Sequence, residues 1–126
     1  MIGLLGPGRV FAYPSPVDLR LGYSGLVGLI RSGLGADPLS GDLFLFVSRR
    51  RRTCKVLSWD GTGLCILMKR LERQCFPALW SRPGLAPEGG LRLTRSELAL
   101  FIEGCDLVGR VTLSPAHVPV SFDVRD

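Results

Sequence analysis

The sequence predicts a single α+β domain, in which a small antiparallel β-meander packs against two helices. Three successive apolar runs of strand length, separated by short connectors, predict the meander. An apolar helical periodicity comes before these runs, and a capping-box motif opens another after them. With 126 residues there is room for one hydrophobic core. We therefore expect one domain over residues 1–107, followed by a poorly patterned, proline-punctuated tail over 108–126.

The first two elements are a short strand and a helix. The segment from Arg9 to Tyr13 is β-like and is stopped by a proline. The helix has two possible N-caps, Ser15 and Asp18. Apolar residues at spacings i, i+4, i+7 and i+11 predict its buried face, and Gly33 and Gly35 end it. The residues of that face are Leu19, Tyr23, Leu26 and Ile30.

The meander is predicted from three strands, 43–47, 53–59 and 64–68. Their connectors, 48–52 and 60–63, both have hairpin length, and the second contains the turn-forming pair Asp-Gly. In a meander, the two connectors lie at opposite ends of the sheet. The third strand should therefore run back towards the first connector.

A second helix is predicted after a Pro/Gly-rich loop over residues 76–90. Thr94 and Glu97 have the spacing of a capping box, and Leu93 is placed to pack on Leu98. Gly104 is the expected residue after the helix C-cap. The expected apolar face consists of Leu98, Phe101, Ile102 and Cys105.

The basic residues are concentrated in one part of the chain. The whole chain has a net charge of +5, whereas residues 49–73 alone contain eight basic and two acidic residues. All basic residues but two are arginines, whose planar guanidinium grips phosphate or carboxylate through two hydrogen bonds. Because the third strand returns towards the first connector, seven of these charges should gather at one end of the sheet. They are Arg49, Arg50, Arg51, Arg52, Lys69, Arg70 and Arg73.

This basic cluster predicts a phosphate-binding surface, with DNA as the expected partner. Two other interpretations remain open. The cluster could bind an acidic protein, or it could be a charged hairpin tip that only discourages aggregation of the sheet edge. Trp59 and Trp80 could stack on bases, although a single tryptophan is more often part of a core.

The sequence contains no recognisable catalytic motif. Its single histidine, His117, lies in the tail, and neither a G-x-S-x-G motif nor a Walker-type loop is present. Most carboxylates are explained as helix caps or turn residues. Asp37 and Asp42 are the pair to test for metal-dependent cleavage. We expect no enzyme activity, no bound metal and no cofactor.

The cysteines and the apolar runs indicate a cytoplasmic protein. The N-terminal residues lack a signal-peptide pattern, and no apolar run approaches the roughly 20 residues of a membrane-spanning helix. No two cysteines have C-x-x-C spacing. We interpret all of them as buried thiols in a reducing compartment. They are Cys54, Cys65, Cys75 and Cys105.

Several stretches of the chain are similar to one known family. They are DLRLGYSGL at 18–26, DPLSGDLFLFVSRRRR at 37–52 and LSWDGTGLCILMKRLER at 57–73, with LFIEGCD at 100–106 in support. Over roughly residues 9–107, the chain resembles the TnpB-type accessory proteins of IS66-family bacterial insertion sequences. It departs from the family pattern after the Lys-Arg-Leu-Glu segment, where the expected glycine is replaced by Arg73.

The resemblance implies a non-catalytic accessory role in transposition, beside a separate transposase encoded by the same element. Combined with the arginine cluster, it predicts a protein that binds DNA or the transposase–DNA complex. An alternative is an interaction module that docks on the transposase without touching DNA. A third interpretation is a small metal-dependent nuclease. The expected location is the cytoplasm, at the nucleoid if the protein is bound to DNA.

Overall fold

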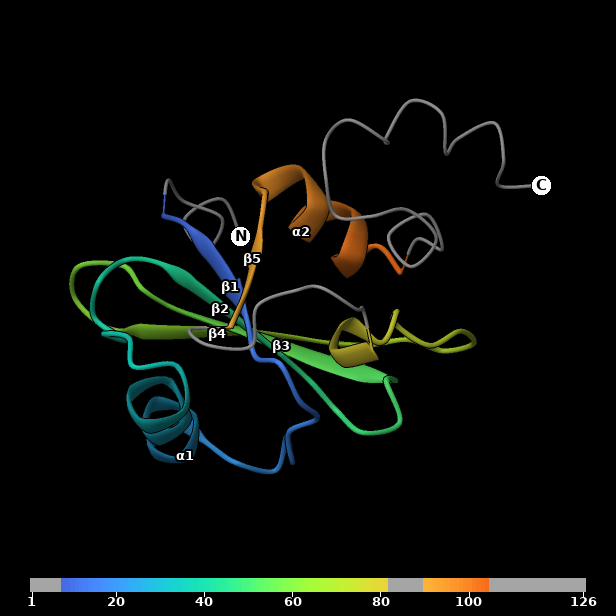
Figure 1. Cartoon of the computed structure of the whole chain (residues 1–126), viewed down its shortest axis with the longest axis horizontal. Helices are drawn as coiled ribbons and strands as arrows, with labels where there is room; N and C mark the ends of the chain where they lie inside the picture. Colours follow the sequence, from blue (N-terminus) through green and yellow to red (C-terminus); the bar gives the residue numbers. More distant parts are fainter. Residues whose placement is uncertain (1–7, 82–89, 105–126) are drawn as a thin grey trace.

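The computed structural model describes residues 8–81 and 90–104, which form one mixed five-stranded sheet between two helical segments. The strand order is β4-β3-β2-β1-β5, and α1 and α2 lie on opposite sides of the sheet (Figure 1). The strands are β1 (Val10–Ala12), β2 (Leu43–Val47), β3 (Thr53–Trp59), β4 (Leu64–Arg70) and β5 (Leu91–Leu93). The helical elements are α1 (Tyr23–Gly28), a π-helical turn (Leu29–Gly33), a 3₁₀ turn (Leu79–Ser81) and α2 (Arg95–Ile102).

The predicted meander is confirmed. Strands β2, β3 and β4 pair antiparallel in sequence order, with Phe44 opposite Leu57 and Thr53 opposite Arg70. The two connectors lie at opposite ends of the sheet (Figure 1). The sheet as a whole is mixed, because β1 pairs parallel with β2. The chain reaches that parallel neighbour by crossing over through α1, as parallel pairing requires.

Both faces of the sheet are covered, which explains the continuous apolar run of β2. All five residues of this strand are buried. Side chains alternate across a strand, so Phe44 and Phe46 pack with α1, while Leu43, Leu45 and Val47 pack on the side of α2. A strand with two buried faces has no polar positions, in contrast to the alternating pattern of a half-exposed strand.

The first helix begins later than predicted. Its N-cap is Gly22, and neither Ser15 nor Asp18 caps it. The preceding segment cannot be helical because the Val17 amide donates a hydrogen bond of 2.9 Å to the carbonyl of Val47, at the end of β2. Asp18 instead accepts a hydrogen bond from the amide of Arg20, which makes a local turn.

The predicted buried face of this helix is correct only in part. Leu26 and Ile30 are fully buried, and Leu19 packs at the edge of the same cluster. Tyr23, predicted on the same face, is half exposed and is the first residue of the helix.

The second helix has the predicted N-terminal cap. The Glu97 amide donates to the Thr94 hydroxyl at 3.0 Å, and the Thr94 amide donates to the Glu97 carboxylate at 2.7 Å. Gly104 follows the C-cap with φ of +74°, as a residue at that position should. The predicted face residue Cys105 lies outside the described part of the chain, as does the tail from residue 108. The domain boundary at 107 therefore stays a prediction.

The expectation of buried thiols holds for Cys54 and fails for two other cysteines. Burial raises the pKa of the Cys54 thiol to about 12. Cys65 is partly buried, whereas Cys75 is exposed because it lies in the loop after β4. All three are free thiols, and Cys105 lies outside the described residues. Within residues 8–81 and 90–104, none of the helices has the length and apolar character needed to cross a bilayer.

Candidate nucleic-acid interface

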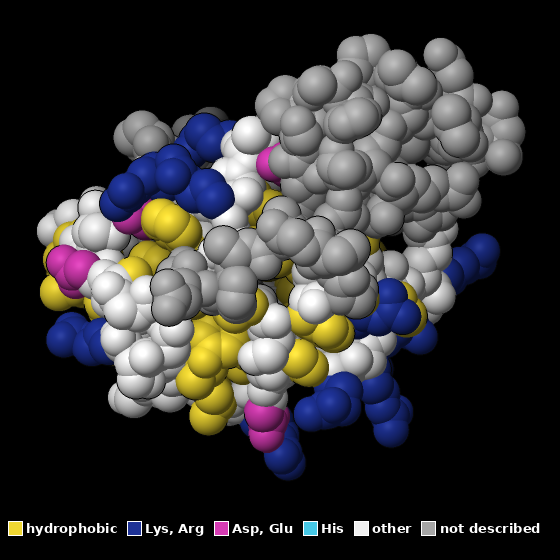
Figure 2. Space-filling view, in the orientation of Figure 1, with side chains coloured by type: hydrophobic (Ala, Val, Ile, Leu, Met, Phe, Trp, Pro, Cys, Tyr) yellow, Lys and Arg dark blue, Asp and Glu magenta, His cyan; other side chains and the backbone are white. Residues whose placement is uncertain are grey.

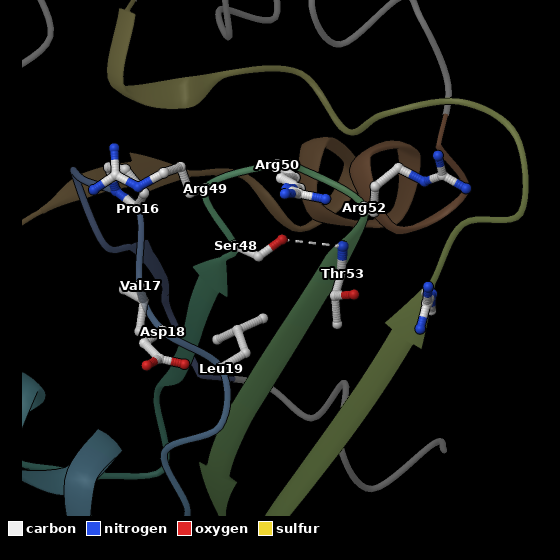
Figure 3. A pocket seen from close by; sticks show the side chains of 10 residues that line it. Pro16, Val17, Asp18, Leu19, Ser48, Arg49, Arg50, Arg52 and Thr53 are labelled. Carbon is white, nitrogen blue, oxygen red and sulfur yellow. Dashed lines mark hydrogen bonds between the residues drawn. The ribbon is translucent and has the colours of Figure 1, made fainter.

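The β2–β3 connector and the C-terminal end of β4 meet at one end of the sheet. Register alone brings them together, since Thr53 at the start of β3 lies opposite Arg70 at the end of β4. Lys and Arg side chains gather at this end of the molecule (Figure 2). A concave site with a volume of about 630 Å³ lies here, which we call the arginine groove (Figure 3). It is lined by Pro16, Val17, Asp18, Leu19, Ser48, Arg49, Arg50, Arg52, Thr53 and Arg70.

A tight loop presents the first arginines of the connector to solvent. The Ser48 amide donates to the Thr53 carbonyl at 3.0 Å, and the Ser48 hydroxyl accepts from the Thr53 amide at 3.3 Å (Figure 3). Arg51 takes a left-handed backbone conformation with φ of +60°, and its amide donates to the Ser48 carbonyl. The two residues between them, Arg49 and Arg50, are exposed at the tip of the loop.

The last two arginines of the connector donate hydrogen bonds to backbone carbonyls. The Arg51 guanidinium donates to the carbonyl of Phe76 at 3.1 Å, and the Phe76 amide donates back to the Arg51 carbonyl. The Arg52 guanidinium donates to Leu71 at 3.1 Å and to Glu72 at 2.8 Å. These bonds tie the connector to the segment that follows β4. Arg51 and Arg52 are therefore parts of the fold as well as sources of charge.

The remaining predicted residues do not all face the arginine groove. Arg70 lines it, on the α1 side of the sheet. Lys69 lies opposite Cys54, whose side chain belongs to the core on the α2 side. Because neighbouring residues of a strand point to opposite faces, Lys69 points away from the groove. Arg73 is exposed in the loop after β4 and does not line the groove. Four of the seven predicted residues line this groove: Arg49, Arg50, Arg52 and Arg70.

The electrostatics of the groove favour an anion. Among the described residues that line it, Asp18 is the only acidic one, and Arg20 pairs with that carboxylate at 2.7 Å. The hydrogen bonds from Arg20 lower the pKa of Asp18 to about 2. In the described part of the chain, Arg49, Arg50 and Arg70 have neither a hydrogen bond from their side chains nor an ion pair. Their guanidinium groups are thus available to a bound partner.

The far wall of the groove was not anticipated from the sequence. Leu19 belongs to the helical face that the periodicity predicted, and Pro16 and Val17 would also be helical with Ser15 as the N-cap. The hydrogen bond from Val17 to the end of β2 brings this segment beside the arginines. That contact joins residues 30 positions apart, and no local pattern signals it.

Two carboxylates outside the groove, those of Asp42 and Asp60, serve the fold. Asp42 accepts hydrogen bonds from the backbone and side chain of Arg9 and from Ser40. Burial acts to raise the pKa of Asp42, but the hydrogen bonds from Arg9 and Ser40 outweigh it and lower the pKa. Asp60 accepts from backbone amides of its own turn, and this lowers its pKa. No group of three potential metal ligands occurs among residues 8–81 and 90–104.

Comparison with known proteins gives one family and two curated relatives. The family model described as "IS66 Orf2 like protein" matches residues 8–111. A protein of Sinorhizobium fredii named "Uncharacterized protein y4jC" is 34% identical over 121 residues, which is 92% of this chain and 97% of that protein. A second protein of the same organism, "Uncharacterized protein y4hO", is 32% identical over 98 residues, covering 78% and 81% of the two chains. No solved structure matches significantly.

Proposed function

We propose, because the chain belongs to the IS66 Orf2-like family, that it assists transposition of an insertion sequence by binding DNA through the arginine groove. Family membership implies the accessory role in transposition. The family match begins just before β1 and extends past the end of α2, so it includes the segments on both sides of the groove. The contact with DNA is the step that we add.

The observation that carries this proposal is the set of unpaired arginines around one groove. Arg49 and Arg50 stand at a loop tip, and Arg70 approaches from the neighbouring strand. A guanidinium without an intramolecular partner can bind phosphate oxygens through paired hydrogen bonds. Such contacts position a protein on the duplex without reading bases, so binding should depend weakly on sequence. None of the described residues that line the groove has an aromatic side chain for base stacking.

The same proposal assigns no catalytic role. Asp42, which could have joined Asp37 in a metal site, is engaged by Arg9 in a salt bridge of 3.0 Å. The Asp37 carboxylate accepts from the amide of Leu39 in an exposed turn. These engagements support an accessory protein that leaves strand cleavage to a separate transposase. Purified protein given Mg²⁺ or Mn²⁺ should not cleave DNA, and cleavage that Asp37→Asn abolished would overturn this assignment.

The direct test compares two arginines that contribute the same charge. Arg50 lines the groove, whereas Arg31 is exposed on the π-helical turn and does not. Affinity for duplex DNA at low salt should fall about 5- to 10-fold for Arg50→Ala, as expected for one lost phosphate contact, and remain near the parent value for Arg31→Ala. Equal losses would mean that only net charge matters, and the groove would not be the binding site.

Docking on the transposase without DNA contact is the alternative outcome. A pull-down with the transposase of the same element, with and without its terminal inverted repeat, separates the two functions. DNA-dependent capture that Arg50→Ala weakens supports the groove as a DNA site. Capture that is independent of DNA and insensitive to salt would assign the protein to transposase docking.

A further inference from the structure

Strand β4 forms a long, unprotected edge of the sheet. It pairs with β3 on one side, and no strand of the described chain lies on its other side. Its sequence, LCILMKR, begins with five apolar residues. Natural edge strands are usually kept short or interrupted by charges or prolines. The opposite edge, β5, is only three residues long, so β4 is the unusual one.

The hydrogen-bond pattern shows which backbone groups of β4 point outwards. The Leu71 amide bonds to the Arg52 carbonyl and the Asp60 amide bonds to the Gly63 carbonyl, and these pairs lie at the two ends of the β3–β4 ladder. Bonded pairs in an antiparallel ladder recur at every second residue. Cys65, Leu67 and Lys69 therefore bond to β3. The outward N–H and C=O groups belong to the alternate residues, Leu64, Ile66, Met68 and Arg70.

These outward groups have no partner within the described residues, and an apolar side chain lies among them. No hydrogen bond from another described segment reaches them. Met68 is 57% exposed, the most exposed of the large hydrophobic residues in the described chain. Its cross-strand neighbour on β3 is Lys55, whose ammonium group donates a hydrogen bond to the carbonyl of Leu21. Among the described residues, none covers more than part of the Met68 side chain.

We propose that two copies of this chain pair through β4, antiparallel, with Leu67 facing Leu67 of the second copy. In this register, all four outward-facing residues of each strand bond across the edge: Leu64 with Arg70, and Ile66 with Met68. Ile66 and Met68 of both copies then form an apolar cluster on the α1 side. Leu67 packs against its counterpart on the α2 side.

The charges of β4 fit this pairing with a second copy. Lys69 lies opposite Cys65, and Arg70 lies opposite Leu64, so no like charges face each other across the edge. The two Lys69 residues are offset by four positions, about 14 Å, and the two Arg70 residues by six, about 20 Å. A register centred on Met68 would bring the two Arg70 residues to about 14 Å and leave Leu64 unpaired.

The pairing also places two arginine grooves on one face of the dimer. A two-fold axis perpendicular to a sheet keeps equivalent faces on the same side. Each groove lies on the α1 side, so both open in the same direction. The dimer rests on the geometry of the edge alone and would stand even if the grooves bound no DNA.

The first experiment measures oligomeric state in the absence of DNA, by sedimentation over a concentration series. The parent should sediment as a dimer. Met68→Lys places two lysines in the centre of the interface and should raise the dimer dissociation constant by about 30-fold or more. Leu39→Lys is the matched control, because Leu39 is 44% exposed and belongs to the connector before β2, a strand that β3 separates from β4 in the sheet. It should leave the dimer intact.

The second experiment tests the register by disulfide cross-linking. Leu67→Cys is made in a background of Cys65→Ser, Cys75→Ser and Cys105→Ser. Residues that face each other at a non-hydrogen-bonded position are close enough for a disulfide. Mild oxidation should therefore give a covalent dimer. The control retains Cys65 and Leu67 in an otherwise matched background, and it should stay uncross-linked because the two Cys65 residues are about 14 Å apart along the strands.

A parent protein that stays monomeric at about 100 µM, about two orders of magnitude above a micromolar Kd, would overturn the proposal. A dimer that Met68→Lys and Leu39→Lys leave equally intact would also overturn it, because the interface would then lie elsewhere. Cross-linking through Cys65 in place of Leu67→Cys would contradict the register. Circular dichroism of each variant establishes that the sheet has formed.

Discussion

Arg52 should matter for stability, whereas Arg49, three positions earlier in the same run, should not. The Arg52 guanidinium donates to two carbonyls of the segment after β4, those of Leu71 and Glu72. Arg49 is exposed at the loop tip and makes no hydrogen bond within the described chain. Replacement of each by alanine removes one charge, so the pair differs mainly in the hydrogen bonds lost.

The magnitude follows from those bonds. A hydrogen bond from a charged donor contributes about 1.5–3 kcal/mol when shielded, and less where water can replace it. Arg52 is partly exposed, and its carbonyl acceptors lie near the surface. We therefore expect Arg52→Ala to lower the free energy of unfolding by about 1–2 kcal/mol. For a domain of this size, that corresponds to a fall in Tm of roughly 4–8 °C.

Thermal and urea denaturation of the two variants provide the assay. Arg49→Ala should lie within about 0.5 kcal/mol of the parent. Circular dichroism before melting shows whether both variants are folded. Equal stabilities for Arg49→Ala and Arg52→Ala would refute the reasoning, because the carbonyl contacts of Arg52 would then contribute nothing.

Three further predictions test the fold. Gly61 has φ of +107°, so Gly61→Val should cost about 1–3 kcal/mol in a urea melt, whereas Gly63→Ala, at a position with open space, should cost little. Thr94→Ala removes the N-cap of α2 and should cost about 1 kcal/mol by the same assay. Asp42→Asn should destabilise the protein near pH 7 by about 1–3 kcal/mol. Folding lowers the pKa of Asp42, so the stabilisation from its carboxylate is present above the unfolded pKa of about 3.9 and is lost as the pH falls through the folded pKa. Plots of the free energy of unfolding against pH for the parent and Asp42→Asn should therefore converge below about pH 4. Plots that stay parallel would exclude this linkage.

Local patterns predicted the elements that local chemistry specifies. The meander followed from run length and turn residues, and the cap of α2 followed from the spacing of Thr94 and Glu97. Strand β5 was missed because three residues carry no measurable period, and its partner β1 lies about 80 positions earlier in the chain.

Contacts between distant segments account for the errors in the first helix and in the site. The bond from Val17 to Val47 overrides a helical periodicity that the sequence does contain. The sequence predicted that seven basic residues lie at one end of the sheet, but it did not predict on which face of the sheet each side chain lies. Because side chains alternate along a strand, Lys69 and Arg70 lie on opposite faces of the sheet. The guanidinium groups of Arg51 and Arg52 donate hydrogen bonds to backbone carbonyls.

The salt dependence of duplex binding is the most direct test of the central claim, that the arginine groove binds DNA phosphates. Each phosphate contact contributes a slope of about −0.9 to a plot of log affinity against log salt concentration. The three unpaired arginines of the groove predict a slope of about −2.7, shared by duplexes of unrelated sequence. The full predicted cluster, with about five of its seven charges in contact, would give about −4 to −5. No binding at low salt, or a slope near zero, would contradict the account.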